Sequence, residues 1–348
     1  MTVVFAGGGT GGHVYPAIAI ADALRERGAR IAFIGTADRL EATIVPKAGY
    51  ELHAIAGRSL PRVPSFALLQ TIAANLKGTF QSLRLLAAQK PDLVVATGGY
   101  VAFPVALAAR IRRALRLSAA PLVLLEPNAA PGLTNRLLSP VVDEVWREAP
   151  IRAELRSLPP RDEAAARLGL RPALQTLLAL GGSQGARSIN DALVRLLENG
   201  GLPSGWQLLA LTGESEYHRV GSALPNARPY LDDMRDAYAA ADLVLARAGA
   251  STLGELAALG KPSILVPYPH AAEGHQSVNA GRFEAAGAAI VLTDEALQEG
   301  ALRSVLSQTV QPQTLASLRA GAARLEGGDA LPSILARIDA LTARKGER

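Results

Sequence analysis

The 348-residue sequence contains no cysteine, so it can form no disulfide, no thiolate metal site and no cysteine nucleophile. Aromatic residues make up only 4% of the chain, too few for the stacking platforms on which proteins bind single-stranded nucleic acid. No apolar stretch reaches the length of a transmembrane helix, and no charged segment precedes an apolar run at the N-terminus. We therefore expect a cytosolic protein.

Acidic residues are almost missing from one long segment. Between Leu52 and Leu125 the only acid is Asp92, whereas nine residues are basic: Arg58, Arg62, Lys77, Arg84, Lys90, Arg110, Arg112, Arg113 and Arg116. Together with apolar neighbours such as Leu60 and Phe66, this charge predicts a surface that binds anionic lipid, where each basic group contributes about 1 kcal/mol. An ordinary solvated face is the alternative. Nucleic acid, suggested by a pI near 9.7, has no binding motif to support it, so we expect no nucleic-acid partner.

The chain begins with a short apolar strand that runs into a glycine-rich turn. Five glycines lie between Gly7 and Gly12, and Pro16 then opens an apolar helical pattern, since proline suits a first helical turn. Glycines let backbone N–H groups approach an anionic group, and a helix N-terminus adds positive potential. His13 is the titratable side chain on the turn. The segment therefore predicts an anion site with a candidate proton acceptor beside it.

The same turn fits other patterns less well. Gly7-x-Gly9-x-x-Gly12 satisfies the dinucleotide-binding pattern, which is a weak signal by itself. The second expected strand, 30–34, is not closed by the carboxylate that would hold a ribose, because Asp38 comes only in the next turn. No Gly-Lys-Ser/Thr follows, which excludes the ATP-binding P-loop. A nicotinamide-dinucleotide-binding protein and a tight turn without ligand stay open as alternatives.

Strand and helix patterns alternate along the chain, which predicts parallel sheets covered on both faces. The pattern breaks between Ser139 and Arg161, where four prolines fall, and restarts with a strand and a second glycine turn, Gly181–Ala186. We expect the fold class α/β, with two doubly wound Rossmann-like domains (1–150 with 331–348, and 151–330) facing across a cleft. Ligands in such sheets bind at the carboxyl ends of the strands. The later strands are expected at 52–56, 92–96, 121–125, 144–146, 176–180, 208–212, 243–246, 264–267 and 289–292.

Three pieces of the second half have the character of a binding site, and the third is the polar run 273–280, which is unsuited to a core or is simply a solvated helix start. Ser183 in the second glycine turn can add a hydroxyl donor, or it can cap a helix. Glu255 is expected in the first turn of a helix, where the helix dipole favours a carboxylate. A carboxylate there can also grip the vicinal hydroxyls of a ribose.

Seven segments resemble, in order, those of one enzyme family. The resemblance is to the MurG family, the UDP-N-acetylglucosamine: undecaprenyl-diphospho-muramoylpentapeptide N-acetylglucosaminyltransferases of bacterial peptidoglycan synthesis. It covers nearly the whole chain, and the ordered set is more specific than any single motif. The segments are 8–13, 97–100, 132–135, 181–186, 231–234, 247–255 and 276–280.

The resemblance implies a two-domain, inverting glycosyltransferase of the GT-B type, which acts in cell-wall biogenesis and so in cell shape and division. Its donor would be UDP-N-acetylglucosamine, and its acceptor a polyprenyl-diphosphate-linked muramoylpentapeptide. The first domain would face the acceptor and the cytoplasmic side of the cell membrane, with the enzyme peripheral on that surface. The second would bind the donor. No metal and no other cofactor is expected, which agrees with the lack of an Asp-x-Asp pair.

Site residues follow from the resemblance one at a time. Thr10, Gly11 and Gly12 are implied to lie beside the acceptor diphosphate and the donor sugar. His13 is implied to be the catalytic base, although a protonated histidine there can instead bind the diphosphate. Asn128 matches a residue that contacts the donor sugar.

The remaining implied residues belong to the donor. Ser183 and Gln184 match the turn that contacts the UDP phosphates, the backbone of Leu231 matches the uracil contact, and Glu255 matches the ribose ligand. Further substrate-binding positions are Ala250, Ser251, Thr252, Leu253, Gly254 and Gln276.

Three places depart from the family pattern: the hinge, Leu125 and Pro127 beside Asn128, where polar residues are usual, and His275, where a glutamine is usual. The hinge reads Glu148-Ala149-Pro150-Ile151-Arg152 where Gly-Asn-Pro-Val-Arg is usual, and Arg152 is expected to replace the family's arginine as a substrate-binding residue. A UDP-N-acetylglucosamine 2-epimerase is the nearest alternative enzyme, but it would place several carboxylates around the sugar, and this chain has few acids on its glycine turns.

Overall fold

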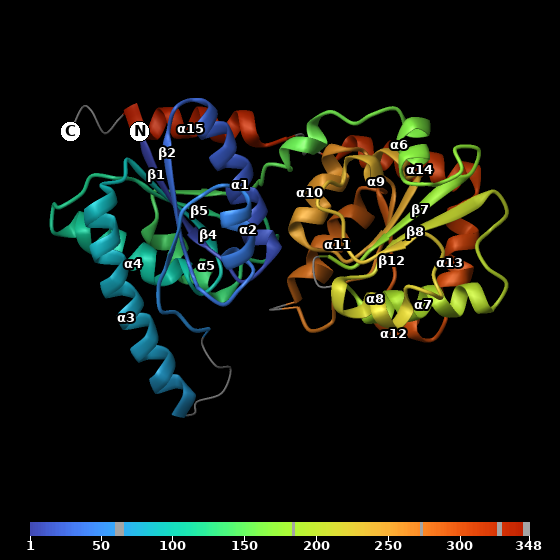
Figure 1. Ribbon diagram of the computed structural model, residues 1–348, viewed down its shortest axis with the longest axis horizontal. Coiled ribbons are helices and arrows are strands. Elements are labelled where there is room, and N and C mark those ends of the chain that lie inside the picture. Colours follow the sequence, from blue (N-terminus) through green and yellow to red (C-terminus); the bar gives the residue numbers. More distant parts are fainter. Residues whose placement is uncertain (60–65, 183–184, 272–273, 326–328, 344–348) are drawn as a thin grey trace. The chain divides into compact units, whose positions relative to one another are not determined.

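The computed structural model describes residues 1–59, 66–182, 185–271, 274–325 and 329–343 (Figure 1). The chain divides into two compact units. Unit 1 comprises Met1–Pro127, Pro131–Ile151 and Asp329–Arg348, and unit 2 comprises Asn128–Ala130 and Arg152–Gly328. The sequence placed the corresponding boundaries at 150 and 330.

Unit 1 is built on a parallel sheet of six strands in the order β3-β2-β1-β4-β5-β6. The strands are β1 (Thr2–Gly7), β2 (Arg30–Gly35), β3 (Leu52–Ala54), β4 (Leu93–Gly98), β5 (Leu122–Leu125) and β6 (Glu144–Trp146). The helices are α1 (Gly11–Glu26), α2 (Glu41–Lys47), α3 (Phe66–Gln89), α4 (Ala102–Ala114), α5 (Leu133–Leu138) and α15 (Leu331–Ala343), with a 3₁₀ turn at Ser139–Val141. The α/β class with a doubly wound sheet is confirmed for this unit.

The two faces of this sheet are covered by different helices. Val3 and Phe5 of β1 pack in one core with residues of α1 and α15, whereas Val4 and Ala6 pack in another with residues of α4. Successive side chains of a strand point to opposite faces. An apolar run with no polar alternation is therefore what a strand buried on both sides requires.

Unit 2 repeats the same architecture, with the strand order β12-β11-β10-β7-β8-β9. The strands are β7 (Gln175–Leu180), β8 (Trp206–Leu211), β9 (Ala227–Arg228), β10 (Leu243–Ala246), β11 (Ser263–Leu265) and β12 (Ala289–Val291). The helices are α6 (Arg161–Arg167), α7 (Arg187–Glu198), α8 (Glu214–Val220), α9 (Arg235–Ala240), α10 (Ala250–Ala258), α11 (His275–Ala285), α12 (Asp294–Gln298), α13 (Leu302–Thr309) and α14 (Pro312–Arg324), after a 3₁₀ turn at Ala153–Arg156. The sequence did not predict β9, because two residues carry no periodicity.

The prediction that Pro16 opens the first helix is wrong. Helix α1 begins at Gly11, after Thr10 in an extended conformation, so Pro16 is its sixth residue and His13 its third. Proline has no N–H, so the carbonyl of Gly12, four residues earlier, lacks its usual helical donor. The consequence for the site is that His13 is fixed in the first turn of a helix and does not lie on the preceding loop.

Helix α3 carries a row of exposed apolar side chains. Leu69, Ile72, Leu76 and Phe80 follow one another at a spacing of three or four residues, and 46–63% of each is exposed. The guanidinium of Arg84 lies 4.4 Å from the centre of the Phe80 ring. None of the helices in the described residues combines the length and the apolar character that crossing a bilayer requires.

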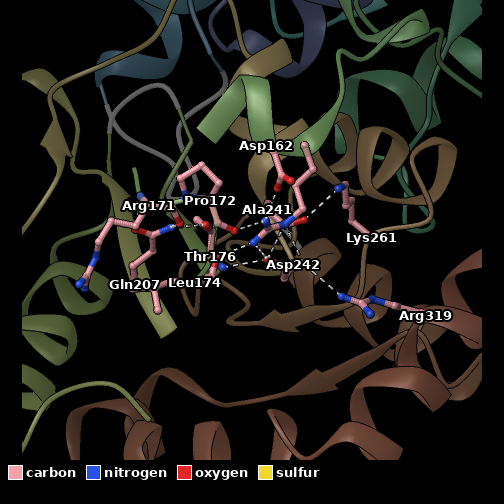
Figure 2. A network of polar contacts seen from close by, with 11 residues as sticks. Asp162, Arg171, Pro172, Leu174, Thr176, Gln207, Ala241, Asp242, Lys261 and Arg319 are labelled. Atoms are coloured by element: carbon pink, nitrogen blue, oxygen red, sulfur yellow. Dashed lines mark hydrogen bonds and ion pairs between the residues drawn. The ribbon is translucent and has the colours of Figure 1, made fainter. Parts of the chain in front are cut away.

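The amino ends of the unit 2 strands are held by a polar network around Asp242, which directly precedes β10 (Figure 2). Its carboxylate accepts hydrogen bonds from the backbone N–H of Thr176 at 2.9 Å and from the Arg161 guanidinium at 2.8 Å. Arg319 of α14 lies 3.4 Å away, and Lys261 donates to the carbonyl of Ala241. One carboxylate thus joins α6, β7, β10 and α14 at the edge of the sheet opposite the second glycine turn.

Candidate functional site

The first glycine turn rests on a buried carboxylate. Glu41, at the start of α2, is 1% exposed and accepts hydrogen bonds from the N–H of Gly9 at 2.8 Å and from the N–H and hydroxyl of Thr36 at 3.0 and 2.7 Å. A Cβ atom placed on Gly8 would lie 2.2 Å from Oε1 of Glu41, so only glycine fits above the carboxylate. Sequence reasoning missed Glu41, because an acid at a helix start is usually solvated.

Unit 1 contains another glycine turn, at Gly98 and Gly99 at the end of β4, and this turn packs directly against the one that follows β1. Strands β1 and β4 are neighbours, with Gly7 and Gly98 in register at their ends. A Cβ atom placed on Gly99 would lie 2.5 Å from the carbonyl oxygen of Gly8. The two turns therefore form one surface of backbone groups at the carboxyl edge of the sheet, where doubly wound sheets bind ligands.

The His13 ring lies beside this surface. A Cβ atom placed on Gly98 would be 2.7 Å from Cε1 of His13 and 3.1 Å from Nδ2 of Asn135, and Gly98 has a φ of +100°. Both the backbone conformation and the lack of a side chain are needed at this position. Gly98 thus leaves the space in which His13 and Asn135 come together.

Asn135 is oriented by a second buried acid, Glu126, which directly follows β5. Its Oε2 accepts hydrogen bonds from Nδ2 of Asn135 at 2.8 Å and from the N–H of Gly132 at 3.3 Å. Sequence reasoning did not select either residue. The available signal was the place of Glu126, because a polar residue at the carboxyl end of a buried strand lies at the ligand-binding edge.

In unit 2, Glu255 lies in the second turn of α10, not in the first as the sequence predicted, because the helix already begins at Ala250. Its buried carboxylate binds Arg152 with both oxygens, Nε to Oε1 at 2.7 Å and Nη2 to Oε2 at 3.1 Å. The hydroxyl of Tyr238 donates to Oε2 at 2.7 Å. Burial alone would lower the pKa of Arg152, but the Glu255 carboxylate raises it above its ordinary value. Two predicted site residues, Arg152 and Glu255, are thus brought together as an ion pair.

A second buried arginine organises the segment after the glycine turn of unit 2. Arg247, at the end of β10, donates to Asp294 at 2.6 Å and to the hydroxyl of Ser188 at 2.8 Å, in the first turn of α7. Burial would raise the pKa of Asp294, but hydrogen bonds from Ser188 and Arg247 hold it below its ordinary value. The cation is therefore fixed near the N-terminus of the helix that follows the turn.

The side chain of Asn279 in α11 orders the segment Asn128–Ala130. Its Oδ1 accepts from the N–H of Ala129 at 2.9 Å, and its Nδ2 donates to Oδ1 of Asn128 at 3.2 Å. Gln276, from the same helix, accepts a hydrogen bond from the N–H of Tyr268. These contacts place Asn128 and Gln276 on the carboxyl side of the unit 2 sheet.

The other predicted site residues are placed as follows. Thr10 is exposed and precedes α1, Gly11 and Gly12 are the first two residues of α1, and Leu231 is half-buried in the segment before α9. Ala250, Ser251, Thr252, Leu253 and Gly254 form the first turns of α10. The hydroxyl of Ser251 is buried and makes no hydrogen bond to any residue that the structure describes. Ser183 and Gln184 lie outside the described residues.

Comparisons with known proteins agree over both units. Residues 3–146 match the glycosyltransferase family 28 N-terminal domain, and residues 176–327 match the glycosyltransferase family 28 C-terminal domain. The UDP-N-acetylglucosamine–N-acetylmuramyl-(pentapeptide) pyrophosphoryl-undecaprenol N-acetylglucosamine transferase of Chlorobium luteolum is 42% identical over 369 residues, covering 97% of this chain and 98% of the relative. The enzyme of the same name from Halothermothrix orenii is 39% identical over 342 residues, covering 89% and 90%. The crystal structure of Acinetobacter baumannii MurG matches with a TM-score of 0.77 at 25% identity, covering 97% of this chain and 99% of that one.

Proposed function

The chain belongs to glycosyltransferase family 28, and on that basis we propose that it transfers N-acetylglucosamine from UDP-N-acetylglucosamine to a diphosphoundecaprenyl-linked muramoylpentapeptide. The observation that carries this proposal is the identity of about 40% to enzymes named for that reaction, over nearly the full length of the chain. The structure adds that both units place glycine turns at the carboxyl ends of parallel strands, where such sheets bind anionic ligands.

In the proposed mechanism, the 4-hydroxyl of the muramoyl sugar attacks the anomeric carbon of N-acetylglucosamine in one inverting displacement, and UDP leaves. His13 takes the proton of the attacking hydroxyl. Thr10, Gly11 and Gly12 bind the acceptor diphosphate with the backbone N–H groups at the start of α1. Glu41 supports this arrangement by accepting a hydrogen bond from Gly9, which fixes the turn. Gly98 has no side chain and therefore leaves room for the His13 imidazole.

The donor is proposed to bind in unit 2. The second glycine turn, with Ser183 and Gln184, and the N-terminus of α7 meet the charge that develops on the leaving diphosphate. Arg247, paired with Asp294, holds the hydroxyl of Ser188 in the first turn of that helix. The uracil is bound by the backbone at Leu231, the ribose by Glu255, and the sugar and phosphates by Asn128, Gln276 and the start of α10.

Measuring UDP release with and without a lipid-linked muramoyl acceptor tests this function against its alternatives. A transferase releases UDP in proportion to the acceptor consumed. A 2-epimerase would change the sugar nucleotide without acceptor, and a nicotinamide-dinucleotide-binding protein would release no UDP in either case. Acceptor-independent release at the same rate would contradict the proposal.

Replacing Glu255 with alanine is expected to weaken UDP binding at least tenfold in calorimetry. The loss of a charged acceptor for the ribose hydroxyls costs about 1.5–3 kcal/mol. Glu255→Gln keeps the volume and separates the loss of charge from disturbed packing around Arg152. Glu214→Ala, which removes an exposed acid at the start of α8, is the control and should bind UDP normally. An unchanged affinity of Glu255→Ala would reduce Glu255 to a structural partner of Arg152.

We also propose that unit 1 attaches to anionic membrane through α3 and the basic segment around it. The exposed row Leu69, Ile72, Leu76 and Phe80 provides apolar side chains, and Arg58 and Lys77 lie on or beside the same helix. Such a combination of apolar residues and cations binds the interface of a bilayer. Arg62 and Leu60, which the sequence analysis groups with them, lie outside the described residues.

Charge reversal at Arg58, Arg62 and Lys77 is expected to weaken binding to phosphatidylglycerol vesicles at least tenfold, since each basic group near the surface contributes about 1 kcal/mol. Sedimentation at low and high salt measures this, and activity on a short-chain soluble acceptor should stay intact. The matched control reverses three exposed arginines of unit 2, Arg171, Arg303 and Arg324. If vesicle binding changed neither with salt nor with charge reversal at Arg58, Arg62 and Lys77, α3 would be an ordinary solvated surface.

A further inference from the structure

The carboxylate of Glu255 is held by two side chains from distant parts of unit 2. Arg152 is the first residue of the segment Arg152–Gly328, which forms most of unit 2, and Tyr238 belongs to α9. Arg152 contacts both carboxylate oxygens, and the Tyr238 hydroxyl contacts Oε2. The carboxylate therefore cannot rotate without breaking at least one hydrogen bond.

Tyr238 is suited only to donate in this contact. Its side chain is 1% exposed, and burial raises the pKa of Tyr238 well above its ordinary value, with a further increase from the neighbouring Glu255 charge. The hydroxyl thus keeps its proton at any physiological pH. A phenylalanine would keep the ring in the same buried position and remove only the hydroxyl that donates to Glu255.

A carboxylate offers about four acceptor positions. Three donors contact the Glu255 carboxylate among the residues that the structure describes. Nε of Arg152 occupies one acceptor position on Oε1, and Nη2 of Arg152 and the Tyr238 hydroxyl occupy two on Oε2. A ligand hydroxyl then meets an acceptor whose orientation is already fixed, so binding involves no further loss of conformational entropy in the Glu255 side chain.

From this geometry we infer that Tyr238 is a positioning residue for nucleotide recognition, which acts through Glu255 by fixing the orientation of its carboxylate. The inference rests on the proposed ribose role of Glu255. It adds a residue that acts on the nucleotide only through the Glu255 carboxylate.

The test measures calorimetric Kd values for UDP and for 2′,3′-dideoxy-UDP with the wild type, Tyr238→Phe, Glu255→Ala and the double variant. Tyr238→Phe is expected to weaken UDP binding roughly threefold to tenfold, the effect of one hydrogen bond. The loss should shrink to less than twofold with the dideoxy nucleotide and in the Glu255→Ala background. A merely structural role would weaken both nucleotides equally.

Tyr50→Phe is the matched control, because Tyr50 is also buried and donates to a carboxylate, that of Asp22, but in unit 1. It should bind both nucleotides like the wild type, and melting temperatures of all variants check folding. Equal losses for UDP and dideoxy-UDP in Tyr238→Phe, or no loss at all while Glu255→Ala is weakened, would overturn the inference alone. Unchanged UDP binding by Glu255→Ala would instead contradict the ribose role on which the inference rests.

Discussion

Replacing His13 with alanine is expected to lower kcat by about 10²–10⁴-fold, the usual contribution of a general base. The KM for the lipid-linked acceptor should change little, because the backbone groups of the glycine turn still bind the diphosphate. The rate of the wild type should rise with pH as the imidazole loses its proton, and this acidic limb should vanish in the variant. Steady-state kinetics with varied acceptor concentration over a range of pH provide all three quantities.

A matched control distinguishes the base from a general effect of losing a histidine in unit 1. His53 lies in β3 and contacts Gln89, away from the glycine turns, so His53→Gln should keep the wild-type kcat and pH profile. If His13→Ala mainly raises the acceptor KM and keeps the acidic limb, His13 binds the diphosphate as a cation. A near-normal kcat would contradict the base.

Removing the carboxylate of Asp242 is expected to destabilise unit 2 by about 2 kcal/mol, because Asp242 is only 11% exposed and its partners lose a charged hydrogen-bond acceptor. Arg161 and the N–H of Thr176 lose their acceptor in Asp242→Ala. Burial lowers the pKa of Lys261 to about 8, and the Asp242 charge opposes that decrease, so a third group is affected. Urea unfolding followed by the fluorescence of Trp206, in a Trp146→Phe background, reports on this unit.

The control uses the second carboxylate bound to the same arginine. Asp162 also lies 2.9 Å from Arg161, but 74% of its side chain is exposed against 11% for Asp242. Asp162→Ala should therefore cost less than about 1 kcal/mol, as exposed ion pairs do. Equal stability of the two variants would contradict a structural role for the network in Figure 2. Activity below the unfolding transition should be normal in both.

The strands and glycine turns could be predicted because their causes are local. Strands buried on both faces are uninterrupted apolar runs, and clusters of glycine that directly follow such runs can be recognised from the sequence. Helix starts were less certain. Pro16 and Glu255 were both placed in first turns, although α1 begins at Gly11 and α10 at Ala250.

The polar groups that support the site could not be predicted, because their partners are distant in the sequence. Glu41 meets Gly9 across 32 positions, and Arg152 meets Glu255 across 103. No spacing rule links such pairs, and an acid at a helix start is usually solvated. The sequence therefore indicated the glycine turns that we propose to bind ligands but not the carboxylate of Glu41 that holds the first of them.

The structure of the reaction product tests the central claim most directly. The purified protein is incubated with UDP-N-acetylglucosamine and a short-chain lipid-linked muramoyl acceptor, and the product is analysed by NMR. We expect one equivalent of UDP and a β-linked disaccharide on the 4-hydroxyl of the muramoyl sugar, since one displacement inverts the α-linked donor. An α-linked product, or a sugar nucleotide epimerised without transfer to the acceptor, would contradict it.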